Sequence, residues 1–436
     1  MTKFLIKDVA IIGAGLGGCA LALALSQQDV PIKVYESRSK NSEVIPSGVT
    51  LTPNGLRVLD QLGVFARIKE RCYIATKRVF KNDRDETIKE VPLGGPEANG
   101  YWNHRIWRSL LLDEMKLMLK ERNVTIQYDS RFTGLVSDND TGVDFMINDN
   151  PQHASLLIGS DGLHSTIRNY LAPGVLPEYT GLTGIIAHIP WKSVAWPYED
   201  YERNATIQGK PGAIFWIAED PEGKDIMIGY QLHFTEQSRD ELTKLQQDKD
   251  KLVEIYRRGY DEHGATARSI IDSVAAHKEH LYLWPFAKMP KLPRWFSNTG
   301  RVILLGDGAH ALPPSSGQGV NQALEDVYSL TLLLVSSATT NLANGVKEDI
   351  EAHSRPSFLE ALDFWQRMRQ DRIDAVLEWT TNTNNVSRLP EAERKRLYGE
   401  GKIREGQGDD TRWLFMFDID KEVKDWLQSQ RSAPLT

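Results

Sequence analysis

The feature that most constrains this chain is a glycine motif between an apolar run and a helix-forming segment. The stretch Gly13-Ala-Gly15-Leu-Gly-Gly18 fits the pattern G-x-G-x-x-G. In this pattern the first glycine makes a tight turn, the second admits a pyrophosphate, and the third lets helix and strand pack closely. Residues 6–12 are apolar enough for a buried strand, and residues 16–28 are rich in Ala and Leu, as in a helix. The motif therefore predicts a Rossmann-like unit that binds a dinucleotide.

An acidic residue follows the motif at the distance that ribose binding requires. Glu36 lies 23 residues after Gly13, at the end of the β-prone run 32–35. A carboxylate at this place accepts hydrogen bonds from ribose hydroxyls. Because the same carboxylate repels a 2′-phosphate, the nucleotide is expected to be FAD or NAD and not NADP.

Two further motifs favour FAD. Residues 301–326 predict a strand that ends at Asp307 and a rigid loop through Pro314. A helix is then expected to open at Gly319, Val320 and Asn321. Asp307 can accept a hydrogen bond from a ribityl hydroxyl, and the helix start can stabilise negative charge on the N1–C2=O edge of a flavin. Another junction from strand to helix follows Asp161.

Together these segments resemble the FAD-dependent aromatic hydroxylases, the single-component class A flavoprotein monooxygenases with the para-hydroxybenzoate hydroxylase fold. The likeness is greatest to the branch that contains salicylate hydroxylase and fungal polyketide hydroxylases. The glycine fingerprint, Asp161-Gly162 and Gly306-Asp307 occur in the order and spacing of that family. The resemblance covers about residues 5–375 and is weak between 178 and 290.

The resemblance implies a set of residues that contact the cofactor. Pro314 would lie beside the flavin C4a edge, and Asp161 belongs to a motif implicated in binding both FAD and reduced nicotinamide. Combined with the glycine motifs, the predicted cofactor-binding residues are Gly13, Gly15, Gly18, Glu36, Gly48, Val49, Arg108, Asp161, Asp307, Gly319, Val320 and Asn321.

The resemblance also implies an activity. NADPH or NADH would reduce the flavin, O2 would add at C4a, and the hydroperoxide would hydroxylate an aromatic or heteroaromatic small molecule. Three alternatives stay open: epoxidation of an indole or alkene, a flavoprotein dehydrogenase or reductase that does not use O2, and a FAD-binding protein without turnover. Halogenation is disfavoured because the Trp-x-Trp-x-Ile-Pro signature is missing, and disulfide exchange because Cys19 and Cys72 form no C-x-x-C pair.

The substrate region departs from the dearomatising fungal relatives. In those enzymes an Arg follows a Thr-Gly pair by five positions, whereas here Ile189 stands at that distance and His188 one position before it. Phenol hydroxylation benefits from a base that removes the phenolic proton. The candidate catalytic residues are therefore His188 and Tyr230, with Pro314 at the flavin and His233 as a further replacement. A histidine on a strand is also often a hydrogen-bonded core residue.

The length of 436 residues exceeds what one core usually supports. Short aromatic segments near 178–235 predict an antiparallel sheet. We expect an α/β fold, with a Rossmann-like FAD-binding domain, an inserted β-sheet substrate domain and C-terminal helices. The expected ranges are 1–75, 100–178 and 295–375 for the FAD-binding domain, 76–99 and 179–294 for the substrate domain, and 376–436 for the helical segment.

Composition and charge limit the kinds of partner and site that this protein is expected to have. With 52 basic and 59 acidic residues, the net charge of −7 argues against a nucleic-acid partner. Two cysteines cannot build a disulfide framework or a multi-thiolate metal site, and no apolar run is long enough to span a bilayer. We therefore expect a cytoplasmic protein, monomer or homodimer, without a metal or a membrane anchor.

Overall fold

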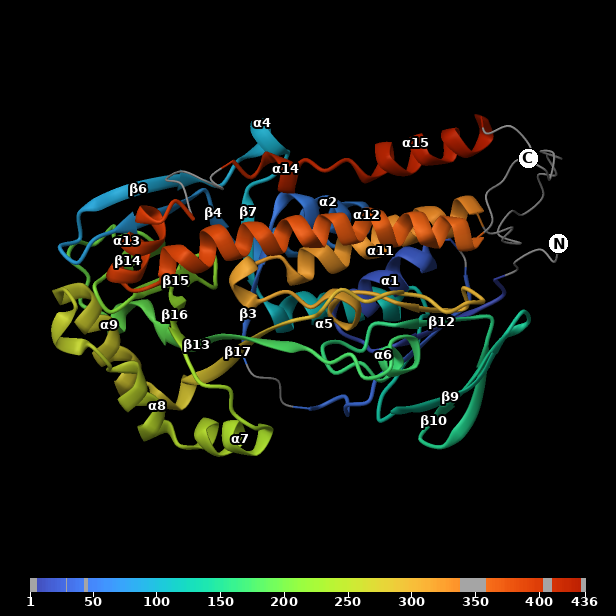
Figure 1. Ribbon diagram of the computed structural model, residues 1–436, viewed down its shortest axis with the longest axis horizontal. Helices are drawn as coiled ribbons and strands as arrows, with labels where there is room; N and C mark the ends of the chain where they lie inside the picture. The colour runs from blue at the N-terminus through green and yellow to red at the C-terminus, as the bar shows by residue number, and fades with distance from the viewer. Residues whose placement is uncertain (1–5, 29, 43–45, 338–357, 403–409, 433–436) are drawn as a thin grey trace.

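The structure is a computed structural model that describes residues 6–28, 30–42, 46–337, 358–402 and 410–432. The other parts of the expected domain ranges, at 1–5, 29, 43–45, 338–357, 403–409 and 433–436, lie outside the described residues. In the described residues, the strands form two large sheets and two small ones (Figure 1).

One large sheet is parallel throughout and carries the glycine motif. Its strand order is β18 (Val302–Leu304), β12 (Leu156–Gly159), β1 (Val9–Ile12), β2 (Ile32–Tyr35) and β8 (Ile126–Gln127). Every residue of β1 is buried, as expected of a parallel strand that is covered on both faces. The apolar runs of the sequence thus became the central strands of a Rossmann-like sheet.

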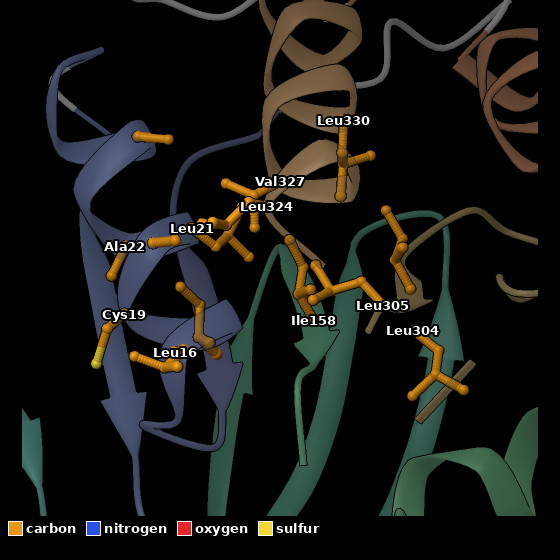
Figure 2. Close-up of a cluster of buried hydrophobic side chains, with 14 of the residues drawn as sticks. Leu16, Cys19, Leu21, Ala22, Ile158, Leu304, Leu305, Leu324, Val327 and Leu330 are labelled. Carbon is orange, nitrogen blue, oxygen red and sulfur yellow. The ribbon is translucent and has the colours of Figure 1, made fainter. Parts of the chain in front are cut away.

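Two helices cover one face of this sheet. Helix α1 (Leu16–Ser26) follows the glycine motif, and α11 (Gly319–Ser337) packs beside it. Figure 2 shows how their side chains meet over the strands, with Leu16, Cys19, Leu21 and Ala22 from α1, Leu324, Val327 and Leu330 from α11, and Ile158, Leu304 and Leu305 from the sheet. The helix predicted at 16–28 is confirmed and ends two residues earlier, and the helix expected to open at Gly319 is confirmed as α11.

The second large sheet has seven strands and builds the β-rich region. Its order is β17 (Tyr282–Lys288), β13 (Glu178–Pro190), β16 (Asp225–His233), β15 (Ala213–Ala218), β14 (Asn204–Gln208), β5 (Lys77–Lys81) and β6 (Thr87–Pro92). Neighbours are antiparallel except β14 and β5, so the predicted antiparallel sheet at 178–235 is confirmed. Helices α7 (Arg239–Gln247), α8 (Lys249–Tyr256) and α9 (Ala265–Ala276) lie on one side of it (Figure 1).

Two small sheets and several helices complete the described fold. One small sheet has the order β3 (Gly48–Leu51), β7 (Asn103–Trp107) and β4 (Tyr73–Ala75), and the other has β11 (Asn150–Ala154), β10 (Gly142–Ile147) and β9 (Phe132–Asn139). The other described α-helices include α2 (Pro53–Gln61), α3 (Phe65–Ile68), α4 (Pro96–Asn99), α5 (Arg108–Glu121), α6 (Thr166–Leu171), α10 (Asp307–His310), α14 (Arg412–Phe415) and α15 (Ile419–Ser432).

The C-terminal part connects the cofactor side to the seven-stranded sheet. Helix α12 (Phe358–Trp379) runs along α11 and ends near β14 and β15 (Figure 1). It continues as a π-helical segment at Thr380–Asn385, a 3₁₀ turn at Val386–Arg388 and α13 (Glu391–Gly399). The expected boundary at 375/376 falls inside α12, so one continuous helix joins the two predicted ranges. In the described residues, no helix combines the length and apolar character needed to cross a membrane.

Candidate functional site

One cavity of about 1260 Å³ runs between the parallel sheet, the seven-stranded sheet and the C-terminal segment. Most of the predicted cofactor residues line it: Gly13, Gly15, Glu36, Gly48, Val49, Arg108, Asp161, Asp307, Pro314, Gly319 and Val320. The predicted residues that do not line it are Gly18, Asn321, His188 and Tyr230. The structure thus brings together segments that are hundreds of residues apart.

The glycine motif forms one end of the cavity. Gly13 has φ of +103°, and a Cβ there would lie 2.4 Å from the Ser160 carbonyl oxygen, so only glycine fits. A Cβ on Gly18 would lie 2.0 Å from the carbonyl oxygen of Gly13, so Gly18 serves the close packing of helix on strand. Gly15 is the N-cap of α1 and offers no side-chain cap. The first amides of α1 are therefore left for an anion such as a pyrophosphate.

Glu36 stands next to this turn with its carboxylate held in place. One oxygen accepts a hydrogen bond from the Ala14 amide and the other from the Arg38 amide, both at 2.9 Å. Each carboxylate oxygen can accept more than one hydrogen bond, so the group still has acceptor capacity on the cavity side. This geometry fits a ribose beside the glycine turn.

Asp307 and Arg108 lie on the central wall of the cavity. Asp307 begins α10 directly after β18, and a Cβ on Gly319 would lie 3.7 Å from its carboxylate oxygen. Arg108 begins α5; burial lowers the pKa of its guanidinium, and the nearby charge of Asp307 opposes that shift. An acceptor, a cation and the start of α11 thus meet at one place, which fits the ribityl chain and pyrimidine edge of a flavin.

Asp161 carries an unsatisfied oxygen. Its Oδ2 accepts hydrogen bonds from the Thr166 and Ile167 amides at the start of α6. Its Oδ1 is buried and has no hydrogen-bond partner in the described part of the chain. Burial raises the pKa of this carboxyl, and the hydrogen bonds to it only partly offset that shift. A ligand hydroxyl or amide at this point would satisfy Oδ1.

Asn321 holds the opening of α11 against the small sheet. Its Nδ2 donates to the carbonyl oxygens of Thr50 and Gly317, and its Oδ1 accepts from the Thr52 amide, each at 3.0 Å. These bonds use the side chain within the protein, and the direct cofactor contact that we expected for Asn321 stays a prediction.

A buried ionic cluster supports the same loop from behind. Arg369 Nε lies 2.8 Å from Asp326 Oδ1, and both Arg369 and Arg372 pair with Glu325. Asp326 Oδ2 contacts His310 Nε2 at 2.5 Å and accepts from the Gly306 amide. Burial opposes ionisation of Asp326, but the charges of His310 and Arg369 outweigh it and keep its pKa below the usual value. The cluster, Glu325, Asp326, Arg369, Arg372 and His310, fixes the turn that presents Asp307.

His188 lies behind the cavity wall. Its Nε2 is 3.3 Å from Glu219, which pairs through both oxygens with Arg105 at 2.9 and 2.6 Å. The imidazole also contacts the rings of Trp107 and Tyr282. Arg105 lines the cavity, so His188 is placed to act on it only through the Arg105–Glu219 pair.

Tyr230 and His233 also lie apart from the cavity lining. The Tyr230 hydroxyl donates to the Pro211 carbonyl oxygen at 3.2 Å, and burial raises its pKa to about 12. His233 is exposed, with Nε2 3.4 Å from Glu393. The catalytic roles suggested for His188 and Tyr230 stay predictions, without a contact to the cavity.

The polar residues that close the substrate end of the cavity were not predicted from the sequence. This end is lined by Arg78, Asn384 and Arg388 together with apolar side chains, among them Phe215, Ile217, Met227 and Phe286. The only signal in the sequence was a polar run at 380–385, followed by an isolated arginine.

Several known proteins of similar sequence are named as hydroxylases or monooxygenases. Hispidin-3-hydroxylase of Neonothopanus nambi is 28% identical over 400 residues, covering 85% of this chain and 86% of that protein. The 6-hydroxynicotinate 3-monooxygenase of Bordetella bronchiseptica is 24% identical over 344 residues, covering 74% and 81%.

Solved structures agree in fold. The substrate complex of a salicylate hydroxylase superposes with a TM-score of 0.72 at 19% identity, covering 99% of both chains. HpxO of Klebsiella pneumoniae, complexed with FAD and uric acid, superposes with a TM-score of 0.71 at 18% identity, covering 98% of both. Residues 7–344 match the family described as "FAD binding domain". With its glycine turn, the Glu36 carboxylate beside it and this match over most of its length, the chain belongs to that FAD-binding family.

Proposed function

We propose that this protein is an FAD-dependent monooxygenase that uses NADPH or NADH and O2 to hydroxylate an aromatic or heteroaromatic small molecule. The observation that carries the proposal is one continuous cavity, which extends from the dinucleotide turn past Pro314 to an end lined with aromatic side chains. The activities named for the similar sequences, on hispidin and on 6-hydroxynicotinate, support the same reaction class.

FAD, when bound, supplies the hydride acceptance and the oxygen activation. The residues that would hold it are those described above: the first amides of α1, Glu36, Arg108, Asp161, Asp307 and the start of α11. The N-terminus of α11 carries a partial positive charge that favours negative charge on the facing ligand. The ionic cluster behind it holds Gly306 and His310 in place, so this charge is preorganised.

The substrate end is built to exclude water. Phe80 and Phe286 are buried, and Phe215, Ile217 and Met227 are half-buried along the cavity. Such walls suit a planar ring and keep water from the reacting atoms. The π-helical segment closes this end, since Asn384 Nδ2 donates to the Ser315 carbonyl oxygen at 3.0 Å, next to Pro314.

The test uses the purified holoprotein. Released flavin should be FAD, and phenolic acids, hydroxypyridines and indoles are screened for stimulation of NAD(P)H oxidation with uptake of O2. A product that contains oxygen from labelled O2 supports hydroxylation or epoxidation, which product structure then separates. Nicotinamide oxidation that continues without O2, with the screened compound reduced in equal amount, would instead identify a reductase that does not use O2. A cytoplasmic location and a monomeric or homodimeric state stay predictions.

A further inference from the structure

Two arginines at the substrate end of the cavity have no negative partner among the residues that the structure describes. Arg78 lies on β5 and Arg388 ends the 3₁₀ turn after the π-helical segment, and both line the cavity. The side chain of Arg388 is buried, at 8% exposure. Within the described residues, no carboxylate forms an ion pair with either guanidinium, and none contributes to their electrostatic surroundings.

The contacts that these arginines do make are neutral. Arg78 Nη1 donates to Asn384 Oδ1 at 3.2 Å, and the guanidinium of Arg388 lies 4.1 Å from the ring centroid of Phe215. Asn384 in turn donates to Ser315, the residue after Pro314. Arg78 is therefore linked through one side chain, that of Asn384, to the loop at which we expect the flavin edge.

The arrangement is costly without a ligand. Burial lowers the pKa of Arg388, and the positive charge of Arg78 lowers it further, to about 9. A buried charge without a partner is strongly unfavourable, and two like charges together are more so. An anion between the two side chains would remove both costs.

The segment that carries Arg388 is fixed in place. Gln208 of β14 donates to the Ser387 carbonyl oxygen at 2.7 Å, and Gln231 of β16 donates to that of Asn385 at 3.4 Å. π-Helical turns are uncommon and occur often at functional sites. The seven-stranded sheet thus holds the segment 380–388 in a position from which Arg388 lines the cavity.

We propose that Arg388 and Arg78 bind the carboxylate of an aromatic acid, which is the substrate class of this enzyme. A guanidinium fork matches a carboxylate in shape and charge, and Phe215 beneath Arg388 fixes the plane of that fork. The ring of the acid packs among the apolar side chains between the arginines and Pro314. The proposal rests on the proposed function, which it narrows to acids.

The test titrates benzoate, salicylate, 4-hydroxybenzoate and 2-naphthoate, each against its carboxamide, into the FAD-loaded protein. Binding is followed by the change in flavin absorbance and by the shift of the thermal unfolding midpoint. At least one acid should bind about tenfold or more tightly than its amide, the loss expected for one charge-assisted hydrogen bond. Arg388→Met should abolish this preference, Arg388→Lys should keep part of it, and the exposed control Arg258→Gln should leave it unchanged.

Two results overturn the proposal: no acid binds more tightly than its amide, or the preference survives unchanged in Arg388→Met. If that variant loses FAD or unfolds, the preference for acid over amide is measured in Arg388→Lys and Arg78→Gln instead. A preference as large as that of the wild type in both variants overturns the proposal. Binding does not depend on turnover, so the two proposals fail separately. Coupled hydroxylation of neutral phenols without any preference for acids would contradict the proposed anion site and leave the proposed monooxygenase activity standing. A preference for acids in binding, without transfer of oxygen to any of them, would contradict the proposed monooxygenase activity and leave the anion site standing.

Discussion

Buried arginines at the two ends of the cavity have opposite kinds of partner. Behind the cofactor end, Arg369 is fully buried and pairs with Glu325 and Asp326. At the substrate end, Arg388 is almost as deeply buried, yet its neighbours are Arg78 and the ring of Phe215. The residue type and the depth are alike, and only the partners differ.

This difference distinguishes buried charges that stabilise the fold from buried charges that are available to bind a ligand. A buried pair satisfied within the chain fixes the relative position of its elements, here α11, α12 and the turn at Gly306. A buried charge left without a counter-ion adds nothing to the fold, so a bound anion is its physical explanation. The predictions below test this division, from the largest expected effect to the smallest.

Arg369→Met should be strongly destabilising. The change leaves the carboxylates of Glu325 and Asp326 buried with only part of their positive partners. Breaking such a pair costs about 3–5 kcal/mol in the free energy of unfolding. Chemical denaturation of the variant and the wild type measures this difference, and a loss below about 1 kcal/mol would show that the cluster does not hold the fold.

Asp307→Ala should weaken FAD binding while the protein stays folded. The carboxylate is exposed on the cavity wall, so its removal leaves no hole in the core. Loss of one charge-assisted hydrogen bond costs about 1.5–3 kcal/mol, which is about tenfold or more in affinity. Fluorescence titration of the apoprotein with FAD gives the dissociation constant, and an unchanged value would remove Asp307 from the flavin site.

Arg388→Met should not destabilise the ligand-free protein, in contrast to Arg369→Met. The variant removes a buried charge, to which the described part of the chain supplies no counter-ion, and replaces it with an apolar side chain. The free energy of unfolding should stay within about 1 kcal/mol of the wild type or rise. A loss as large as that of Arg369→Met would mean that Arg388 holds the fold, and the contrast between the two ends would disappear.

His188→Gln should have the smallest effect. The imidazole lies behind the Arg105–Glu219 pair and does not line the cavity. We expect product formed per NAD(P)H oxidised to stay within about threefold of the wild type, far below the effect of losing a general base. A fall of about 100-fold with normal FAD content would restore His188 as the base.

The cofactor end was predictable from the sequence because its signals are local. Gly13 supplies the positive φ of the tight turn, Gly18 packs against the Gly13 carbonyl oxygen within the strand–turn–helix unit, and Glu36 follows at the end of the next strand. The apolar run before Gly13 became β1 because a strand covered on both faces needs continuous apolar residues.

The substrate end was not predictable because its residues meet only in the folded chain. Arg78 and Asn384 are hydrogen-bonded across 306 positions of sequence. Residues 380–385 have low helix propensity and lie in the range 376–436 that was expected to be helical, but no pattern in the sequence placed them at the cavity. They form a π-helical segment after α12, and Gln231 of the seven-stranded sheet donates to the Asn385 carbonyl oxygen. For His188, the sequence distance to Thr183-Gly184 was informative, but which face of β13 meets the cavity depends on tertiary packing.

The central claim is that this cavity oxygenates an aromatic acid, and product analysis under labelled O2 tests it most directly. The FAD-loaded protein is mixed with NADPH or NADH and the acid that binds most tightly, and the product is analysed by mass spectrometry. We expect one labelled oxygen atom in the product for each turnover, with little product from the matching amide. Nicotinamide oxidation that yields no labelled product from any acid or amide would contradict it.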